Sequence, residues 1–195
     1  MKKILKFPLL RQTYNYDCGA NVVQNILGYY GLDVREGNIM KIARTKKSGT
    51  NIGGIKKVLK YFGLSYEEKK MNIQTIKKYL NKKIPVILMI QAWTEQKDVN
   101  WKNDWKDGHY VTAIGYDKNK IYFQDPSSEK ITFLTYKQLG ERWHDKDTKN
   151  KKIINQGLAV KRNKYSKNPH PEKVTDYKEY GKTYRYDNKK VIHMG

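Results

Sequence analysis

A cysteine, a histidine, an aspartate and a glutamine in this 195-residue chain have the types and the order that covalent acyl transfer requires. Cys18 is the sole cysteine and stands at the start of a predicted helix, where unpaired backbone amides and the helix dipole stabilise a thiolate. A lone cysteine is, however, more commonly a small buried apolar residue. Its position at a helix start therefore leaves the nucleophile and the buried residue as equal alternatives. Cys18 is a candidate nucleophile if the chain supplies it with a base.

His109 and Asp125 are the candidate base and the residue that orients it. His109 opens one predicted strand, residues 110–116, and Asp125 closes the next, residues 120–124, after a short turn. In an antiparallel hairpin the start of the first strand and the end of the second lie at the same end. With a regular register, their even separation is expected to place both side chains on one face. Asp125 would then orient the imidazole so that its other nitrogen faces a thiol.

Gln12 is the candidate oxyanion donor. An acyl-transfer site needs hydrogen-bond donors at the position where the oxyanion develops. The side-chain amide of Gln12 and the backbone N–H of Cys18 would together supply them. Taken alone, a polar residue six positions before a cysteine is ordinary, so this interpretation depends on the other three residues.

The elements that must carry these residues divide the chain into a helical half and a strand half. Apolar residues at helical spacing predict helices over residues 17–30, 36–44, 52–62 and 72–80. The first of these is predicted to be half-buried, with a polar face formed by Asn21, Gln24 and Asn25. Short apolar runs predict strands over residues 86–90, 110–116, 120–124, 131–134 and 153–160, with a short helix over 135–143. Helices followed by neighbouring strands predict an α+β fold with an antiparallel sheet.

Residues 93–107 form a predicted polar loop that leads directly into His109. Three tryptophans mark it: Trp93, Trp101 and Trp105. Their indoles either line a substrate groove or anchor the loop to the protein, and the sequence supports both interpretations.

The composition predicts one domain over residues 1–162, followed by a basic, tyrosine-rich extension over residues 163–195. A single cysteine excludes an internal disulfide and a cysteine-based zinc cluster. The first ten residues do not read as a signal peptide, and no apolar run approaches the ~18 residues that span a bilayer. The expected location is therefore the cytoplasm.

The formal net charge of +21 suggests attraction to a polyanion such as nucleic acid. The lysines are scattered along the chain, however, which favours a compositional bias over a dedicated binding site. Two other patterns are weak: Gly53-Gly54 is expected to serve packing rather than phosphate binding, and His144, Asp145 and Asp147 are expected to form a solvated loop. We therefore predict no metal and no cofactor.

The local sequences around these residues resemble those of the C39 family of papain-like cysteine peptidases. The matching motifs, in order, are Gln12-x-x-x-x-Asp17-Cys18-Gly19, Gly108-His109-Tyr110-Val111 and Asp125-Pro126. The resemblance spans about residues 10 to 160. It implies a papain-like fold with a helical lobe and a β lobe. It also implies that Cys18 is the nucleophile, His109 the general base, Asp125 its orienting group and Gln12 the oxyanion donor.

The best-known members of that family are domains of bacteriocin-exporting ABC transporters, which cut leader peptides after a double glycine. This sequence shows no transmembrane segment and no Walker motif. It more closely resembles free-standing C39-like proteins, which share the tryptophan-rich loop and the segment 142–145. The resemblance implies a peptide or precursor-protein substrate and allows a separate transporter as a partner.

Two alternatives stay open. The same scaffold supports other thiol-based acyl transfer, such as amidase or transpeptidase chemistry, because a fold does not determine a reaction. The chain would instead be a binding module if it used its positive charge and its tyrosine-rich extension to hold a polyanion.

Overall fold

The computed structural model describes residues 2–147, 149–162 and 183–185. Its helices are α1 (Cys18–Tyr29), α2 (Glu36–Ala43), α3 (Ile52–Tyr61), α4 (Ile73–Asn81) and α5 (Tyr136–Arg142). Its strands are β1 (Lys3–Ile4), β2 (Leu64–Lys70), β3 (Val86–Gln91), β4 (Gly108–Tyr116), β5 (Lys120–Gln124), β6 (Ile131–Thr135), β7 (His144–Lys146), β8 (Lys152–Ile154), β9 (Gln156–Arg162) and β10 (Thr183–Arg185).

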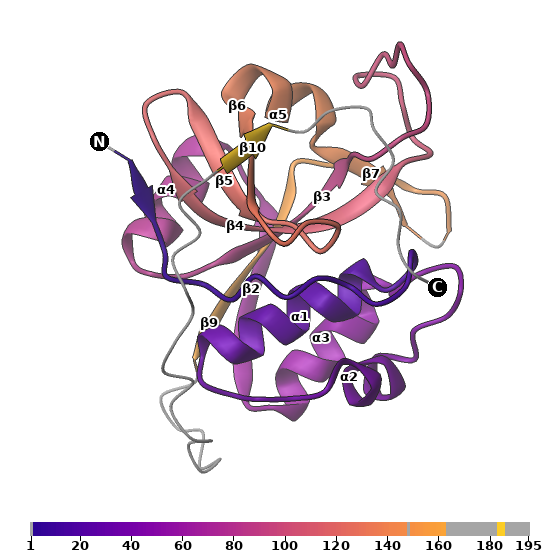
Figure 1. Cartoon of the computed structure of the whole chain (residues 1–195), viewed down its shortest axis with the longest axis vertical. Helices are drawn as coiled ribbons and strands as arrows, with labels where there is room; N and C mark the ends of the chain where they lie inside the picture. Colours follow the sequence, from indigo (N-terminus) through magenta and orange to yellow (C-terminus); the bar gives the residue numbers. More distant parts are fainter. Residues whose placement is uncertain (1, 148, 163–182, 186–195) are drawn as a thin grey trace.

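A central sheet separates two groups of helices. Its strand order is β10-β6-β5-β4-β3-β9-β2, with β1 also pairing with β4, while β7 and β8 form a separate hairpin. Helices α1, α2 and α3 lie together on one side, and α4 and α5 lie on the other (Figure 1). The pairs are antiparallel except for β10 with β6, which is parallel. The predicted α+β fold is confirmed.

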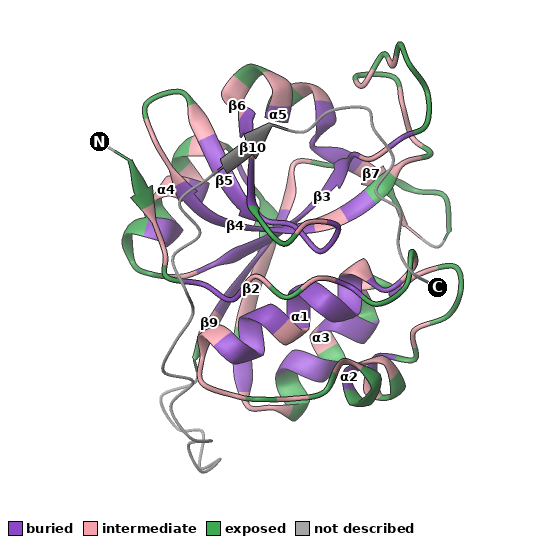
Figure 2. Ribbon diagram, in the orientation of Figure 1, coloured by how far each residue is buried: buried purple, intermediate pink, exposed green. Residues whose placement is uncertain are grey.

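Two hydrophobic clusters, one on each face of the sheet, explain why β3 is a continuous apolar run. Ile87 packs with α1 and α3 in the first cluster, whereas its neighbours Val86 and Leu88 pack in the second cluster with α4 and α5. Every residue of β3 is buried (Figure 2). A strand that is covered on both faces has no polar side to alternate with its apolar side.

The helix boundaries follow local signals in the sequence. Gly31 and Gly63 follow the ends of α1 and α3 with positive φ angles of 83° and 72°, as expected of glycine just past a helix. Asn51 caps the start of α3 by accepting a hydrogen bond from the backbone N–H of Gly54. Within the described residues, no helix is long and apolar enough to cross a membrane.

The structure differs from the predicted elements in several places, among them the predicted strand 153–160 and the unpredicted strand β2. The predicted strand over residues 153–160 is two strands, β8 and β9, because Asn155 between them has a φ of 56° and turns the chain. Strand β2 was not predicted, since it is a charged edge strand with only its first residue buried. Of the predicted extension, residues 183–185 form β10, and the rest lies outside the described residues.

Candidate active site

Cys18 is the first residue of α1 and is partly exposed. The helix has no acidic side chain in its first turn, and Asp17 before it makes no side-chain cap to the helix. No side chain in the first turn therefore offsets the positive end of the helix dipole, which favours a negative charge on a thiol at this position. This is the position that a reactive thiolate requires.

A buried polar network fixes α1 against the strands, and it overturns one prediction. Asn21 and Asn25, predicted to lie on an exposed polar face, are both fully buried. Asn25 accepts a hydrogen bond from the backbone N–H of Leu10 at 2.8 Å and donates to the side-chain oxygen of Asn21 at 2.9 Å. Gln124, at the end of β5, donates to the same oxygen of Asn21 at 3.4 Å. Buried amides need partners, and these connect the Cys18 helix with the residue that precedes Asp125.

His109 and Asp125 form a buried pair at the end of the sheet. The Nε2 atom of His109 lies 2.7 Å from Oδ1 of Asp125, and Asp125 is fully buried. Burial opposes a charge on the ring, but the Asp125 carboxylate and the hydrogen bonds to Asp125 and Cys18 outweigh it and raise the pKa of His109 to about 10. Because Nε2 contacts Asp125, Nδ1 is the ring nitrogen left for the Cys18 thiol. A protonated imidazole there stabilises a thiolate.

The predicted regular register of the hairpin is wrong, because β4 contains a bulge between Ala113 and Gly115. The observed pairs are Tyr116–Ile121 and Gly115–Tyr122 near the turn, then Ala113–Phe123 and Thr112–Gln124 beyond the bulge. Had the register of the turn continued, Thr112 would lie opposite Asp125, and His109 would point to the other face. The extra residue, Ile114, shifts the pairing by one position and brings His109 and Asp125 to the same face.

The positions of neighbouring side chains agree with this assignment. Val111 and Ala113, on the face of His109, belong to the same core cluster as Ile121 and Phe123, on the face of Asp125. Gln12 lies beside this end of the hairpin, since its backbone N–H donates to the carbonyl of Pro126 at 2.9 Å. Its side-chain Nε2 donates to the carbonyl oxygen of Tyr14. The structure thus brings Gln12, Cys18, His109 and Asp125 into one region.

The three tryptophans of the loop contact the protein itself. Trp93 donates its indole N–H to Oδ2 of Asp125 at 2.8 Å. The Trp101 ring lies 3.7 Å from the guanidinium of Arg142, and the Trp105 ring stacks at a tilt on His144 with a centroid distance of 4.4 Å. These contacts anchor the loop. That the indoles line a substrate groove stays a prediction.

Sequence reasoning missed the residue that holds the base of this loop. Gln91, the fully buried last residue of β3, accepts from the backbone N–H of Asp107 at 2.9 Å. It also donates to the carbonyl of His144 at 2.9 Å. A buried glutamine that ends a wholly apolar strand is the signal that would have identified it, because such an amide needs partners. The prediction of a solvated loop is wrong for His144, which is buried at the start of β7. Among the described residues, no group of three His, Cys, Asp or Glu side chains is placed to hold a metal ion.

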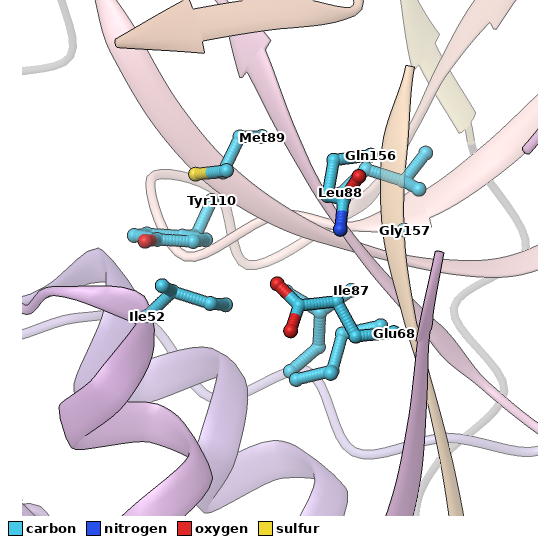
Figure 3. A pocket seen from close by; sticks show the side chains of 9 residues that line it. Ile52, Glu68, Ile87, Leu88, Met89, Tyr110, Gln156 and Gly157 are labelled. Carbon is cyan, nitrogen blue, oxygen red and sulfur yellow. The ribbon is translucent and has the colours of Figure 1, made fainter. Parts of the chain in front are cut away.

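A small hollow lies next to this region, beneath the ring of Tyr110 (Figure 3). Its volume is about 10 Å³, and side chains of α3, β2, β3 and β9 line it with Tyr110. Burial, with a contribution from the nearby Cys18, raises the pKa of the Tyr110 hydroxyl. The hollow is mostly apolar, with Glu68 at its edge, and accepts no more than a small group.

Protonation of Asp17, the residue before α1, makes the stability of the fold depend on pH. Its buried carboxylate accepts the backbone N–H of Tyr14 at 3.1 Å. Burial and the nearby charge of Glu36 raise its pKa from 3.8 to about 6. The folded state therefore holds this proton more tightly than the unfolded state. The stability that results is fully present below about pH 3.8 and is lost as the pH rises through about 6.

Asp17→Asn is expected to become more stable relative to the wild type as the pH rises from about 4 to about 6, because the amide carries no charge to bury. Urea unfolding at several pH values measures the difference. Asp117→Asn is a control of opposite sign: although burial acts the other way, hydrogen bonds from Tyr122 and two backbone N–H groups lower the pKa of Asp117. Above about pH 4, the free energy of unfolding of the wild type should exceed that of Asp117→Asn. If the difference in unfolding free energy between the wild type and Asp17→Asn does not change with pH, the raised pKa assigned to Asp17 is wrong.

A helical group set against an antiparallel sheet, with a thiol at the start of the first helix and an imidazole–carboxylate pair at the sheet end, is the architecture of a papain-like peptidase domain. The chain belongs to the peptidase C39 family, which matches residues 6–148. The resemblance seen in the sequence is confirmed, and family membership supports a peptidase function.

Individual relatives agree on the fold. The pediocin PA-1 transport/processing ATP-binding protein PedD of Pediococcus acidilactici is 23% identical over 128 residues, which are 65% of this chain and 16% of that protein. Among solved structures, the peptidase domain of Streptococcus ComA, a bifunctional ABC transporter, has 20% identity and a TM-score of 0.61, covering 80% of this chain and 98% of that one.

Two further structures are similar. A C39-like peptidase from Bacillus anthracis has 16% identity and a TM-score of 0.62, covering 84% of this chain and 98% of that one. A double glycine motif protease from an AMS/PCAT transporter, solved with its leader peptide, has 17% identity and a TM-score of 0.59, covering 82% and 94%. At these identities the likeness establishes the fold.

Proposed function

We propose that this protein is a cysteine peptidase that hydrolyses a peptide bond after small residues, in a leader or precursor peptide. The observation that carries the proposal is the line from Cys18 through His109 to Asp125. It places a thiol at a helix N-terminus, beside an imidazole held 2.7 Å from a buried carboxylate. This arrangement has the three parts of an activated nucleophile: the nucleophile, its base and the group that orients the base.

The proposed reaction begins with attack of the Cys18 thiolate on the substrate carbonyl carbon. The protonated His109 then gives its proton to the leaving amine, and a thioester with Cys18 remains. Water, deprotonated by His109, attacks the thioester and releases the acid and the thiol. Asp125 keeps the imidazole oriented and stabilises its charged form throughout.

Gln12 is proposed to hold the oxyanion together with the backbone N–H of Cys18. One hydrogen of its side-chain amide is donated to the carbonyl of Tyr14, which fixes the direction of the amide plane. A primary amide has a second hydrogen, which remains available for the oxyanion.

Four findings support a leader peptide cut after small residues as the substrate. The family match, the transport/processing relative and the protease solved with its leader peptide concern proteins of this kind. The hollow beneath Tyr110, the residue that follows His109, admits only a small group. None of the relatives reported above supports polyanion binding, so we do not propose it. A separate transporter that exports the cut peptide fits the proposal as a partner.

The test is cleavage of a synthetic leader peptide ending in Gly-Gly, analysed by mass spectrometry. We expect a cut after the second glycine, and a rate at least about 10-fold lower when valine replaces that glycine, because a filled pocket discriminates on size by this order. Cys18→Ala is the control for contaminating proteases. Equal cleavage of both peptides would contradict the size preference. Products joined to an added amine, in place of the free acid, would replace hydrolysis with acyl transfer.

A further inference from the structure

Trp93 has a backbone conformation that bulky residues rarely adopt. Its φ is 62°, in the left-handed region. It stands one residue after the base of the 93–107 loop, where Ala92 donates its backbone N–H to the carbonyl of Asp107 at 2.9 Å. The backbone N–H of Asp107 in turn donates to Oε1 of Gln91 at 2.9 Å. Such strain persists only where the surrounding structure determines it, and it is frequent at functional sites.

The indole of Trp93 reaches the carboxylate that orients His109. Asp125 accepts two hydrogen bonds on Oδ1, from Nε2 of His109 at 2.7 Å and from the backbone N–H of Ser127 at 2.8 Å. Trp93 donates to the other oxygen, Oδ2, at 2.8 Å. A carboxylate held at one oxygen can still rotate about its bond to Cβ. A donor on the second oxygen fixes its plane.

We propose that Trp93 is a positioning residue of the peptidase site, and that its indole N–H locks the Asp125 carboxylate in the plane that presents Oδ1 to His109. The proposal rests on the proposed function, which assigns Asp125 to His109. Asp125 is fully buried, so without the indole its Oδ2 would lack this donor in a place where water does not readily replace it. The left-handed backbone at Trp93 turns the ring back onto Asp125 instead of out along the loop.

The test is Trp93→Phe, which keeps a ring and removes the N–H. The readout is the rate at which iodoacetate alkylates Cys18, measured from pH 4 to 11 without any peptide. This anionic reagent reacts fastest when the thiolate stands next to a cation, so the rate falls where His109 loses its proton. In Trp93→Phe we expect this alkaline fall to occur about one pH unit lower, since a lost hydrogen bond to a charged group is worth about tenfold.

Trp143→Phe is the matched control. Trp143 also donates its indole N–H, but to the backbone carbonyl of Gln156 at 2.9 Å, so loss of this bond affects stability without touching Asp125. We expect its pH profile to match the wild type, with the fold of both variants checked by thermal unfolding. If Trp93→Phe does not fold, 3-benzothienylalanine at position 93 keeps the shape of tryptophan without the N–H, and the same shift is expected.

The outcomes separate this proposal from the proposed function. His109→Ala should lose the alkaline fall altogether. If it does, but Trp93→Phe keeps the profile of Trp143→Phe, the positioning by Trp93 is wrong and the thiol–imidazole pair stands. If His109→Ala keeps the wild-type profile, the pair itself is absent and the proposed function fails.

Discussion

Cys18→Ala and His109→Ala are each expected to lower kcat/KM for the Gly-Gly leader peptide by about 10⁶-fold, and the double variant no further. The thiol and the imidazole act as one unit: without the ring the thiolate loses its cation and the leaving amine its proton donor. Each single change therefore removes what the pair achieves together. Mass spectrometry of the cleaved peptide over long incubations measures the residual rates.

Asp125→Asn provides a graded comparison. The amide keeps the shape of the carboxylate but not its charge, so we expect a smaller loss, about 10⁴-fold. Alkylated protein, with Cys18 blocked, sets the background. If the two losses in kcat/KM multiply in the variant that combines Cys18→Ala with His109→Ala, the two residues act independently and the proposed mechanism fails.

Gly54→Ala is expected to destabilise the fold by about 3 kcal/mol, because overpacking at a rigid contact is costly. Gly54 lies in α3 where the helix crosses the end of α2. A Cβ added there would collide with the backbone carbonyl oxygen of Ala43 and lie 3.2 Å from its carbon. Backbone cannot rotate away as a side chain can, so the two helices must separate. Chemical denaturation measures the loss.

Gly53→Ala is the matched control, one residue away in the same helix. A Cβ at Gly53 would meet Oδ1 of Asn51 at 3.1 Å, a side-chain atom that needs to shift by only a few tenths of an ångström and can still accept its cap bond from Gly54, now 2.8 Å long. Alanine is the better helix former, so this variant is expected to be unchanged or up to about 1 kcal/mol more stable. Equal destabilisation by both substitutions would mean that Gly54 is not a packing contact.

The sequence was sufficient to predict the division into helices and sheet because hydrophobic periodicity is a local signal. It also led to Cys18, His109 and Asp125, each next to a recognisable local motif. It could not predict the bulge at Ile114, since a bulge depends on how two strands pair. A regular register was assumed, and that register would have separated His109 from Asp125.

Tertiary contacts account for other residues whose surroundings the sequence did not reveal. Asn21 and Asn25 look like a solvent-facing stripe, but both are buried, and Asn25 bonds to the backbone of Leu10 in the segment before α1. Trp93 reads as a loop aromatic until its indole is found on Asp125. In both cases the partner is far away along the chain. Periodicity and propensity carry no information about such a partner.

The 93–107 loop is closed at its base, next to the proposed catalytic residues. Hydrogen bonds of Asp107 with Gln91 and Ala92 hold both ends together, so Trp93 and His109 stand at fixed ends of the loop. Because both ends are tied to β3 and β4, a change in loop length ahead of Trp101 is expected to leave Trp93 and His109 in place. A loop whose two ends are tied in this way can differ in length between relatives while the reacting groups keep their positions.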